Sequence, residues 1–512
     1  MRSASASAST KDHPMSSLSA TARRVPTWLA IVAASLPMFM ATLDNLVITN
    51  ALPAIRLDLG ASIEELQWFV NAFTLAFASF ILAAAALGDR IGRRTVFVAG
   101  IVVFTLASVF AALSTEPWQL IAARAVQGFG AAGIMPLSLT LLAGSVPARL
   151  RPAAIGIWGG VAGLGVAVGP LVGGAVIEGW NWEAIFWLNV PIGIIAVPLA
   201  LFALPNTLGA RLRVDVLGVL LAGLGVLGVV FGIVRGNDAG WDSIEVVGSL
   251  VAGTVLLAAF LFWESRASAP LLPLRLFRDR SFSVANIVGF AFSFGIFGSV
   301  FILIQFLQIV QGDSPLAAAV KTMPWTLAPM VVAPLAGLFS GRVGTRALIV
   351  TGLAFEAIAL TWLGLTLSAD VSYATLVAPF ILAGVGMGLV FAPSATAVLA
   401  SMPEADTAKA SGTNSTLREV GIALGVAVLT AVFVGAGGEL TPTGYVDAAI
   451  PAVFTGAAAL LLAVIAALFL PAGRAASSTD HGAGDVDADA DADARDTAAF
   501  QGAVREAVPS KA

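Results

Sequence analysis

Two charged side chains of opposite sign, Asp44 and Arg124, each interrupt a long apolar segment of the sequence. Inside a bilayer a charged side chain costs about 2.5–3.5 kcal/mol on insertion scales, and such residues usually pair and mark ion or substrate pathways. Burial and a neighbouring cation shift the pKa of a carboxyl group in opposite directions. Forming and breaking an Asp44–Arg124 pair could therefore bind and release a proton. The alternative is a static ion pair that only fixes the two segments to each other.

Glu356 is a further deep acid, near the middle of another apolar segment. It could recognise a cation or serve as a second proton site. Alternatively, it is a packed, hydrogen-bonded neutral acid, because an isolated carboxylate is costly to bury. Lys321, near one end of an apolar segment, could extend to the membrane surface or repel cations from a substrate cavity.

Other kinds of chemistry have few residues to use. The chain has no cysteine, and its two histidines, His13 and His481, lie in the polar ends. Thiolate and imidazole chemistry is therefore excluded from the apolar segments, where proton chemistry must use carboxylates. The sequence shows no nucleophile–base pair, metal-ligand cluster or phosphate-binding loop. We expect neither enzyme activity nor a metal, cofactor, ATP or nucleic acid as a partner.

The composition is that of a membrane protein. Of 512 residues, 58% are hydrophobic and 11% are charged, with a mean hydropathy of +0.92, whereas soluble domains carry roughly 25% charged residues. Apolar runs of about twenty residues, enough to cross a bilayer as a helix, recur along the chain. The sequence predicts an all-α, multi-pass protein with fourteen transmembrane helices, at 28–51, 64–88, 95–114, 117–140, 152–177, 182–204, 214–234, 245–264, 282–309, 315–340, 346–367, 372–399, 411–435 and 447–470.

The distribution of basic residues predicts the orientation. With the N-terminus in the cytoplasm, 22 of the 27 Lys and Arg residues fall in cytoplasmic segments and two, Arg56 and Arg235, in external loops. This asymmetry follows the positive-inside rule. Both termini are therefore predicted to be cytoplasmic, in a protein of the cell membrane, and the polar ends 1–26 and 472–512 are predicted to be disordered.

The predicted helix ends place Asp44 and Arg124 at similar depth. Asp44 lies about six residues from the outer end of the first helix, and Arg124 about seven residues from the outer start of the fourth, at a rise of about 1.5 Å per residue. Both would lie roughly 10 Å below the outer face.

An internal repeat divides the chain. Segment 85–94 aligns without gaps to segment 337–346, which lies 252 residues later, and Gly128 and Gly130 match Gly384 and Gly386 at an offset of 256. The repeat predicts two like-oriented six-helix bundles, 27–204 and 281–471, with an inserted helix pair and linker at 205–280. Secondary transporters with this plan bind substrate near the midplane, between the halves.

Six motifs occur in order along residues 27–470: LDNLVITNALP at 43–53, LGDRIGRR at 87–94, RAVQGFG at 124–130, GVAVGPLVGG at 165–174, WEAIFWLNVPIG at 182–193 and SGTNSTLREVG at 411–421. Together they resemble the major facilitator superfamily, and within it the fourteen-span drug:proton antiporters. The resemblance implies that the first and fourth helices line the substrate cavity. Two departures are Ala85, where the family has Gly, and Gly341, where an acid would stand in the second copy of the loop.

The resemblance also implies a cytoplasmic gate in the loop after the second helix. Asp89 would face the positive N-terminus of the helix at 411–435 in the outward-facing state, with Gly92 providing the turn. The arginines of the loop also satisfy the positive-inside rule, and Gly341 confines acid-dependent gating to the first half. Arg418 and Glu419 could join this network, although adjacent residues cannot simply pair with each other. The predicted gating residues are Asp89, Arg90, Gly92, Arg93, Arg94, Arg418 and Glu419.

The helix at 152–177 carries the motif that is similar to the exporter signature of the family. Its small residues allow another backbone to approach closely, and its proline permits a kink. These features could form a pivot between the halves, or they could be ordinary close packing. The residues concerned are Gly165, Gly169, Pro170, Gly173 and Gly174.

These observations predict a proton-coupled antiporter that exports small amphipathic drugs or antibiotics, acting as a monomer by rocking of its two halves. Three alternatives remain open at this point. The protein could export a single endogenous metabolite, it could be an importer, or it could be a receptor or scaffold without transport.

Overall fold

The apolar segments form helices in a computed structural model of the chain, which describes residues 26–471 apart from 148–149, 210–214, 269, 400–401 and 403–405. The predicted disordered ends, 1–26 and 472–512, therefore lie outside the described residues except for Pro26. Within the described residues every regular element is a helix.

The helices run through the chain in the predicted order. Thirteen spans among the described residues are long and apolar enough to cross a membrane, with α6 and α7 counted as one span. Helix α5, of 29 residues, occupies the remaining predicted span, so the prediction of a fourteen-helix membrane protein is confirmed. The elements are α1 (Thr27–Leu59), α2 (Ile63–Ile91), α3 (Arg93–Ala112), α4 (Pro117–Ser145), α5 (Arg151–Gly179), α6 (Ala184–Trp187), α7 (Asn189–Ala203), α8 (Val216–Ala239), α9 (Ile244–Glu264), the 3-10 helix η2 (Leu274–Arg278), α10 (Arg280–Ile309), α11 (Pro315–Val343), α12 (Thr345–Thr366), α13 (Tyr373–Leu399), α14 (Thr407–Gly435) and α15 (Val446–Ala467).

Helix α1 is longer than predicted. It continues past residue 51 to Leu59, where Gly60 closes it in the left-handed conformation with φ of 64°. The helix continues because Leu52 and Ile55 are fully buried, so packing favours further turns. Asp44 consequently lies near the middle of α1 and not about six residues from its end, whereas Arg124 lies seven residues from the start of α4 as predicted. Their depth below the outer face of the membrane stays a prediction. Arg56 lies in the last turn of α1 and not in a loop.

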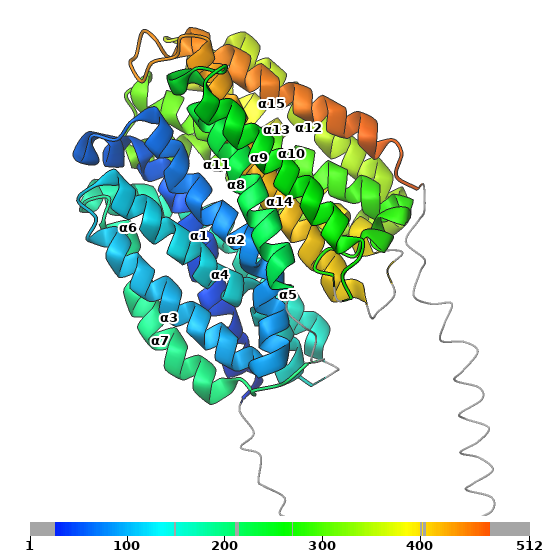
Figure 1. Cartoon of the computed structure of the whole chain (residues 1–512). Helices are drawn as coiled ribbons and strands as arrows, with labels where there is room; N and C mark the ends of the chain where they lie inside the picture. The colour runs from blue at the N-terminus through cyan, green and yellow to red at the C-terminus, as the bar shows by residue number, and fades with distance from the viewer. Residues whose placement is uncertain are drawn as a thin grey trace, which may run out of the picture.

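Two groups of helices pack mainly within themselves (Figure 1). In the first, α2 and α3 pack against α4, and α1 packs against α5. In the second, α11 and α12 pack against α13, and α10 packs against α14 and α15. The inserted helices α8 and α9 pack against each other, and α8 also contacts α2 and α14. These contacts support the proposed division into two bundles and an inserted pair.

Corresponding helix contacts recur in the two groups. A Cβ added to Gly128 would lie 2.2 Å from the carbonyl oxygen of Phe73, and one added to Gly384 would lie 2.5 Å from that of Trp325. Phe73 and Trp325 are 252 positions apart, and Gly128 and Gly384 are 256 positions apart. These are the two offsets of the sequence repeat. Small residues thus allow the same close helix approach in both halves.

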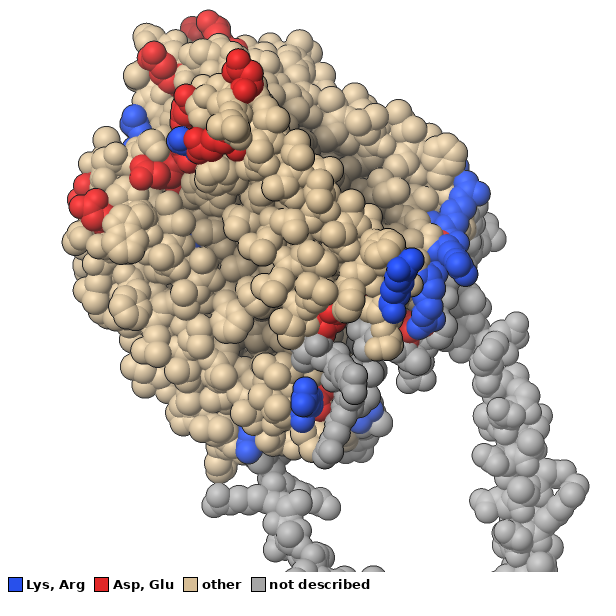
Figure 2. Space-filling model, viewed as in Figure 1, with Lys and Arg blue, Asp and Glu red and all other residues tan. Residues whose placement is uncertain are grey.

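Charged side chains separate along the molecule. On the face shown, most acidic side chains gather at one end and most basic ones toward the other (Figure 2). This separation supports the predicted orientation. Following that orientation, we call the end with the α1–α2 and α10–α11 connections the outer end.

Substituting Gly128 by Ala tests the close contact of α4 with α2. The added methyl group meets a backbone carbonyl oxygen, and overpacking of this kind costs about 1–3 kcal/mol, which offsets the gain of about 1 kcal/mol in helix propensity. The melting temperature of the purified variant in detergent should therefore fall. Gly144→Ala is the control, because a Cβ at Gly144 on the same helix has no atom within 4 Å. If Gly128→Ala melted at or above the temperature of this control, the contact would be refuted.

Candidate functional site

A buried polar cluster forms where α1, α3, α4 and α7 meet. Arg124 of α4 donates from Nη1 to Oδ2 of Asp44 on α1, and the side chains are 0% and 1% exposed. Asn189, at the start of α7, donates to Oδ1 of Asp44 at 2.6 Å. Gln127 of α4 donates to the same oxygen at 3.2 Å. The hydroxyl of Ser108 on α3 accepts from Gln127 at 2.8 Å and from Asn189 at 3.2 Å.

The surroundings of Arg124 hold its guanidinium group in place. Nε donates to the carbonyl oxygen of Phe69 at 3.0 Å, Nη1 donates to Gln127 at 2.9 Å, and the group lies 4.5 Å from the ring centroid of Phe73. A buried ion pair is tolerated when additional hydrogen bonds satisfy its remaining atoms. Nη2 has no partner among the described residues, so the pair is nearly but not fully satisfied.

Sequence reasoning did not assign Ser108, Gln127 or Asn189 to the site. Gln127 and Asn189 stand inside two of the six motifs, and all three are polar residues in apolar helices. That polarity was the available signal. That Gln127 and Asn189 both donate to Asp44 and to Ser108 could not be read from it, because the three residues come from three different helices.

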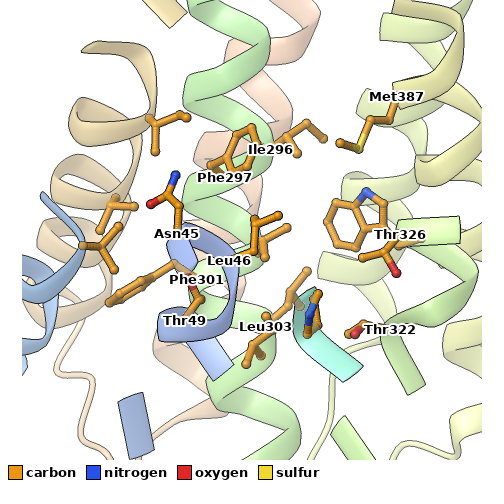
Figure 3. Close-up of a pocket in the computed structure, with 17 residues that line it drawn as sticks. Asn45, Leu46, Thr49, Ile296, Phe297, Phe301, Leu303, Thr322, Thr326 and Met387 are labelled. Carbon is orange, nitrogen blue, oxygen red and sulfur yellow. The ribbon is translucent and has the colours of Figure 1, made fainter. Parts of the chain in front are cut away.

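The central cavity lies between the two halves. Its walls include Asn45, Leu46 and Thr49 of α1, Phe297 and Phe301 of α10, and residues of α2, α5, α11, α13 and α14. Asn45, Thr49, Thr322 and Thr326 supply polar groups to its walls (Figure 3).

The polar cluster and the cavity lie on different sides of α1. Asp44 is not among the described residues that line the cavity, and α4 supplies none of them. The expectation that the fourth helix lines the cavity is therefore wrong for this conformation, because Arg124 and Gln127 point into the first bundle. α1 separates the two features and contributes side chains to both.

A hydrogen-bond network closes the two halves against each other near the outer end. The amide of Asn50 on α1 donates to the carbonyl oxygens of Pro170 on α5 at 3.2 Å and Pro315 on α11 at 2.9 Å. Gln308 of α10 donates to both oxygens of Asn50, at 3.0 and 2.9 Å. Asn50, which follows the cavity residue Thr49 in α1, therefore joins helices of both halves.

The glycines predicted in α5 all make close contacts. A Cβ at Gly165 or Gly169 would meet α1 side chains at 3.4 and 3.3 Å, and one at Gly173 would meet Val47 at 2.6 Å. At Gly174 it would lie 2.7 Å from the backbone of Leu316 on α11. This part of α5 thus packs closely against both α1 and the other half, an arrangement that fits either a pivot or ordinary packing.

The predicted gate residues of the α2–α3 loop interact locally. Nε of Arg93 donates to Asp89 at 2.7 Å, and Arg94 donates to the carbonyl oxygens of Leu201 and Leu204, both at 3.0 Å. Gly92 has φ of 116°, which only glycine adopts readily, and Arg90 is exposed. In this conformation the partner of Asp89 is Arg93, so its contact with the N-terminus of α14 stays a prediction for another state.

Arg418 and Glu419 lie well inside α14. The guanidinium of Arg418 lies 4.6 Å from the ring centroid of Phe391 on α13 and beside Asn414 and Gly289. Oε2 of Glu419 has no partner among the described residues. The contacts found for Arg418 are thus with α10, α13 and α14, and the structure does not join this residue to Asp89.

Glu356 is fully buried in α12, away from the cavity. A Cβ at Gly386 of α13 would lie 2.6 Å from its Cγ, so the residue is packed as expected. Neither carboxyl oxygen has a partner among the described residues. The hydrogen bonds expected of a packed neutral acid are therefore not found in the described part of the chain, because the facing surface of α13 presents a glycine.

Lys321 is engaged by an acid. Its ammonium group lies 2.6 Å from Oδ1 of Asp313 and 5.8 Å from the ring centroid of Tyr373. It does not belong to the described lining of the cavity.

Comparisons with known proteins agree with this architecture. The family model of the Major Facilitator Superfamily matches residues 34–328 and 287–508. The chain is 34% identical to the multidrug resistance protein Stp of Mycobacterium tuberculosis over 79% of this chain and 75% of that protein. It is 32% identical to the tetracenomycin C resistance and export protein of Streptomyces glaucescens, over 83% and 79%. It is 37% identical to the cephamycin export protein CmcT of Amycolatopsis lactamdurans, over 86% and 92%.

Removing the Asn50 side chain should open the outer end. Asn50→Ala loses hydrogen bonds between the halves worth about 1 kcal/mol each, so outward-open states become more populated. Because the chain has no cysteine, Thr322→Cys provides a single thiol in the cavity wall. We expect a membrane-impermeant maleimide added outside to label it about fivefold faster in the Asn50→Ala background.

Gln311→Ala is the matched control for that experiment. Gln311 lies near the same end, but its amide donates to Ala369 within the second half. Labelling in this background should match that of Thr322→Cys alone. Equal labelling in the Asn50→Ala and Gln311→Ala backgrounds would show that Asn50 does not hold the halves together.

Proposed function

The chain belongs to the major facilitator superfamily, and we propose that it exports small amphipathic drugs or antibiotics in exchange for protons. It is a multi-pass membrane transporter and not an enzyme. The proposal adds the direction of transport, the coupling ion and the cargo to this assignment. It also includes action as a monomer in the cell membrane with both termini in the cytoplasm.

The buried contact between Asp44 and Arg124 is the observation that carries the coupling proposal. The carboxyl group of Asp44 accepts hydrogen bonds from Arg124 and from two amide donors. Protonation of Asp44 would remove the attraction that holds α1 to α4. Since Asn45 and Leu46, the next residues of α1, line the cavity, any movement of α1 that follows would change the substrate site.

Alternating access would then use two sets of contacts. In the conformation described here, the hydrogen bonds around Asn50 would close the outer end, and substrate would enter from the cytoplasmic side. Rocking of the halves would break these hydrogen bonds. It would also bring Asp89 to the N-terminus of α14 and so close the cytoplasmic side. A proton arriving from outside would drive this cycle, with about 2.3 kcal/mol available per charge per 100 mV of membrane potential.

The names of the relatives support export. They include a multidrug resistance protein and two antibiotic export or resistance proteins, and the helix with the exporter-like motif packs at the contact between the halves. A mostly apolar cavity discriminates weakly between substrates of similar shape, which favours several cargoes. Export of a single endogenous metabolite is the alternative, and a growth-inhibition panel with expressing and empty cells separates the two.

Asp44→Asn tests the coupling. In inverted vesicles, addition of an exported drug should release protons from the lumen through the wild-type protein, and this flux should fall to the background of empty vesicles in the variant. The amide keeps the size of the side chain but cannot ionise, so it loses both the ion pair and the proton. Asp58→Asn is the control, because Asp58 lies on the same helix and, among the described side chains, accepts a bond from Trp182 at the outer end.

Three outcomes would revise the proposal. Full flux in Asp44→Asn would mean that the ion pair is static. If Glu356→Gln lost the proton flux while Asp44→Asn kept it, the coupling residue would be Glu356 on α12 and not Asp44. No flux in the wild type with any exported drug would exclude proton exchange and favour a receptor or scaffold.

A further inference from the structure

The polar groups of the central cavity are all uncharged. They include the amide of Asn45 and the hydroxyls of Thr49, Thr322 and Thr326, and no described residue that lines the cavity is an acid or a base. Asn45 and Thr49 lie on α1, whereas the other two threonines lie on α11, across the cavity (Figure 3). A molecule held there would meet hydrogen-bonding groups on two sides without meeting a fixed charge.

Charged residues next to the lining are paired elsewhere or do not belong to the lining. Asp44 precedes Asn45 but is bound to Arg124, and Lys321 precedes Thr322 but is bound to Asp313. Glu419 lies one helical turn from the lining residue Ile422, but it is not among the described residues that line the cavity. No carboxylate of the described lining is therefore available as a counter-ion for a bound cation.

A permanent cation would lose its hydration in this cavity without gaining a counter-ion. An unpaired buried charge is strongly unfavourable. Aromatic rings can compensate in part, and Phe297, Phe301 and Trp325 are available. However, the ring of Trp325 already stacks with Phe380 at a centroid distance of 5.8 Å. A neutral aromatic molecule has no such charge to desolvate and gains from apolar burial.

We propose that the cavity selects neutral aromatic molecules that carry a hydrogen-bond acceptor and rejects permanent cations of the same shape. The inference rests on the proposed function, because it names the class of cargo for the same site. It narrows the amphipathic cargo proposed above to uncharged members of that class.

Trp325 is the residue that would recognise the acceptor. It is 3% exposed, it lines the cavity, and its Nε1–H group has no partner among the described residues. A buried donor without a partner is unfavourable. A carbonyl oxygen of the cargo would satisfy it, so Trp325 acts as a specificity-determining residue.

A neutral cargo also determines how transport responds to voltage. Exchange of an uncharged molecule for a proton moves net positive charge into the cell, whatever the number of protons. Exchange of a monovalent cation for one proton would move none. Transport of the neutral cargo should therefore accelerate when the inside is made negative at constant pH.

The decisive experiment uses two dyes that share one ring system. The dyes 10-methylacridone, which is neutral and has a carbonyl acceptor, and 10-methylacridinium, a permanent cation, are titrated by fluorescence against the purified full-length chain in detergent. The wild type should bind the neutral dye about tenfold more tightly. Trp325→Phe, which removes the donor but keeps a ring, should weaken this binding about fivefold and leave cation binding unchanged.

A charge placed in the cavity should reverse the selection. Thr326→Asp should strengthen binding of the cationic dye about tenfold, whereas the uncharged control Thr326→Asn should not. Equal binding of both dyes to the wild type, tighter binding of the cation, or no binding of the neutral dye would overturn the proposal. Unchanged cation binding in Thr326→Asp would also overturn it, because the cavity charge would then not decide selection.

The proposed function can fail separately. Binding in detergent requires neither a membrane nor a proton gradient. Selective binding of the neutral dye together with absent proton flux in vesicles would refute proton-coupled export and leave the charge selection intact. Proton flux driven equally well by both dyes would refute the selection and leave proton-coupled export intact.

Discussion

The first half of this protein contains a full ionic pair that is buried among apolar helices. No water is available in hydrocarbon to satisfy polar atoms, so the chain must supply donors for Asp44 and acceptors for Arg124. Asn189 of α7 donates to Asp44, and Gln127 of α4 accepts from Arg124. Four helices thereby meet at one polar cluster around the carboxyl group of Asp44, and the coupling proposed above depends on this arrangement.

The second half repeats the backbone packing without the polar cluster. In the first half Gly169 packs against Leu43, the residue before Asp44. In the second half the counterpart of Gly169, which is Gly425, packs against Phe294, the residue before Gly295. Gly295 therefore occupies the position that corresponds to Asp44. A Cβ at Gly295 would lie 2.8 Å from the backbone of Gly456 on α15. The helix approaches closely here because no side chain needs hydrogen-bond partners. The two bundles thus share a packing pattern but differ at this position, where the first has the buried ion pair and the second has a close glycine contact.

The described lining of the cavity is uncharged because the buried charges near it point elsewhere. The charges of the first half point away from it, and the Asn50 network closes it toward the outer end with amides and carbonyl groups. What remains at the interface is apolar or neutral. The coupling that we propose would then have to pass through movement of α1, because Asp44 is not among the described residues that line the cavity in this conformation.

The sequence by itself determined the helical membrane class, the number of spans, the repeat and the family, because hydropathy and motif spacing are local properties of the chain. It also identified Asp44 and Arg124, since a charge in an apolar run is visible without a fold. Its end for α1 was wrong, because burial of Leu52 and Ile55 by other helices extends that helix beyond the apolar run. Only the tertiary structure decided that Asn189 and Ser108 complete the polar cluster, that Asn50 joins the two halves, and that Asp44 faces away from the cavity. These depend on which face of each helix meets its neighbours, and contacts between residues of different helices leave no local pattern from which that can be read.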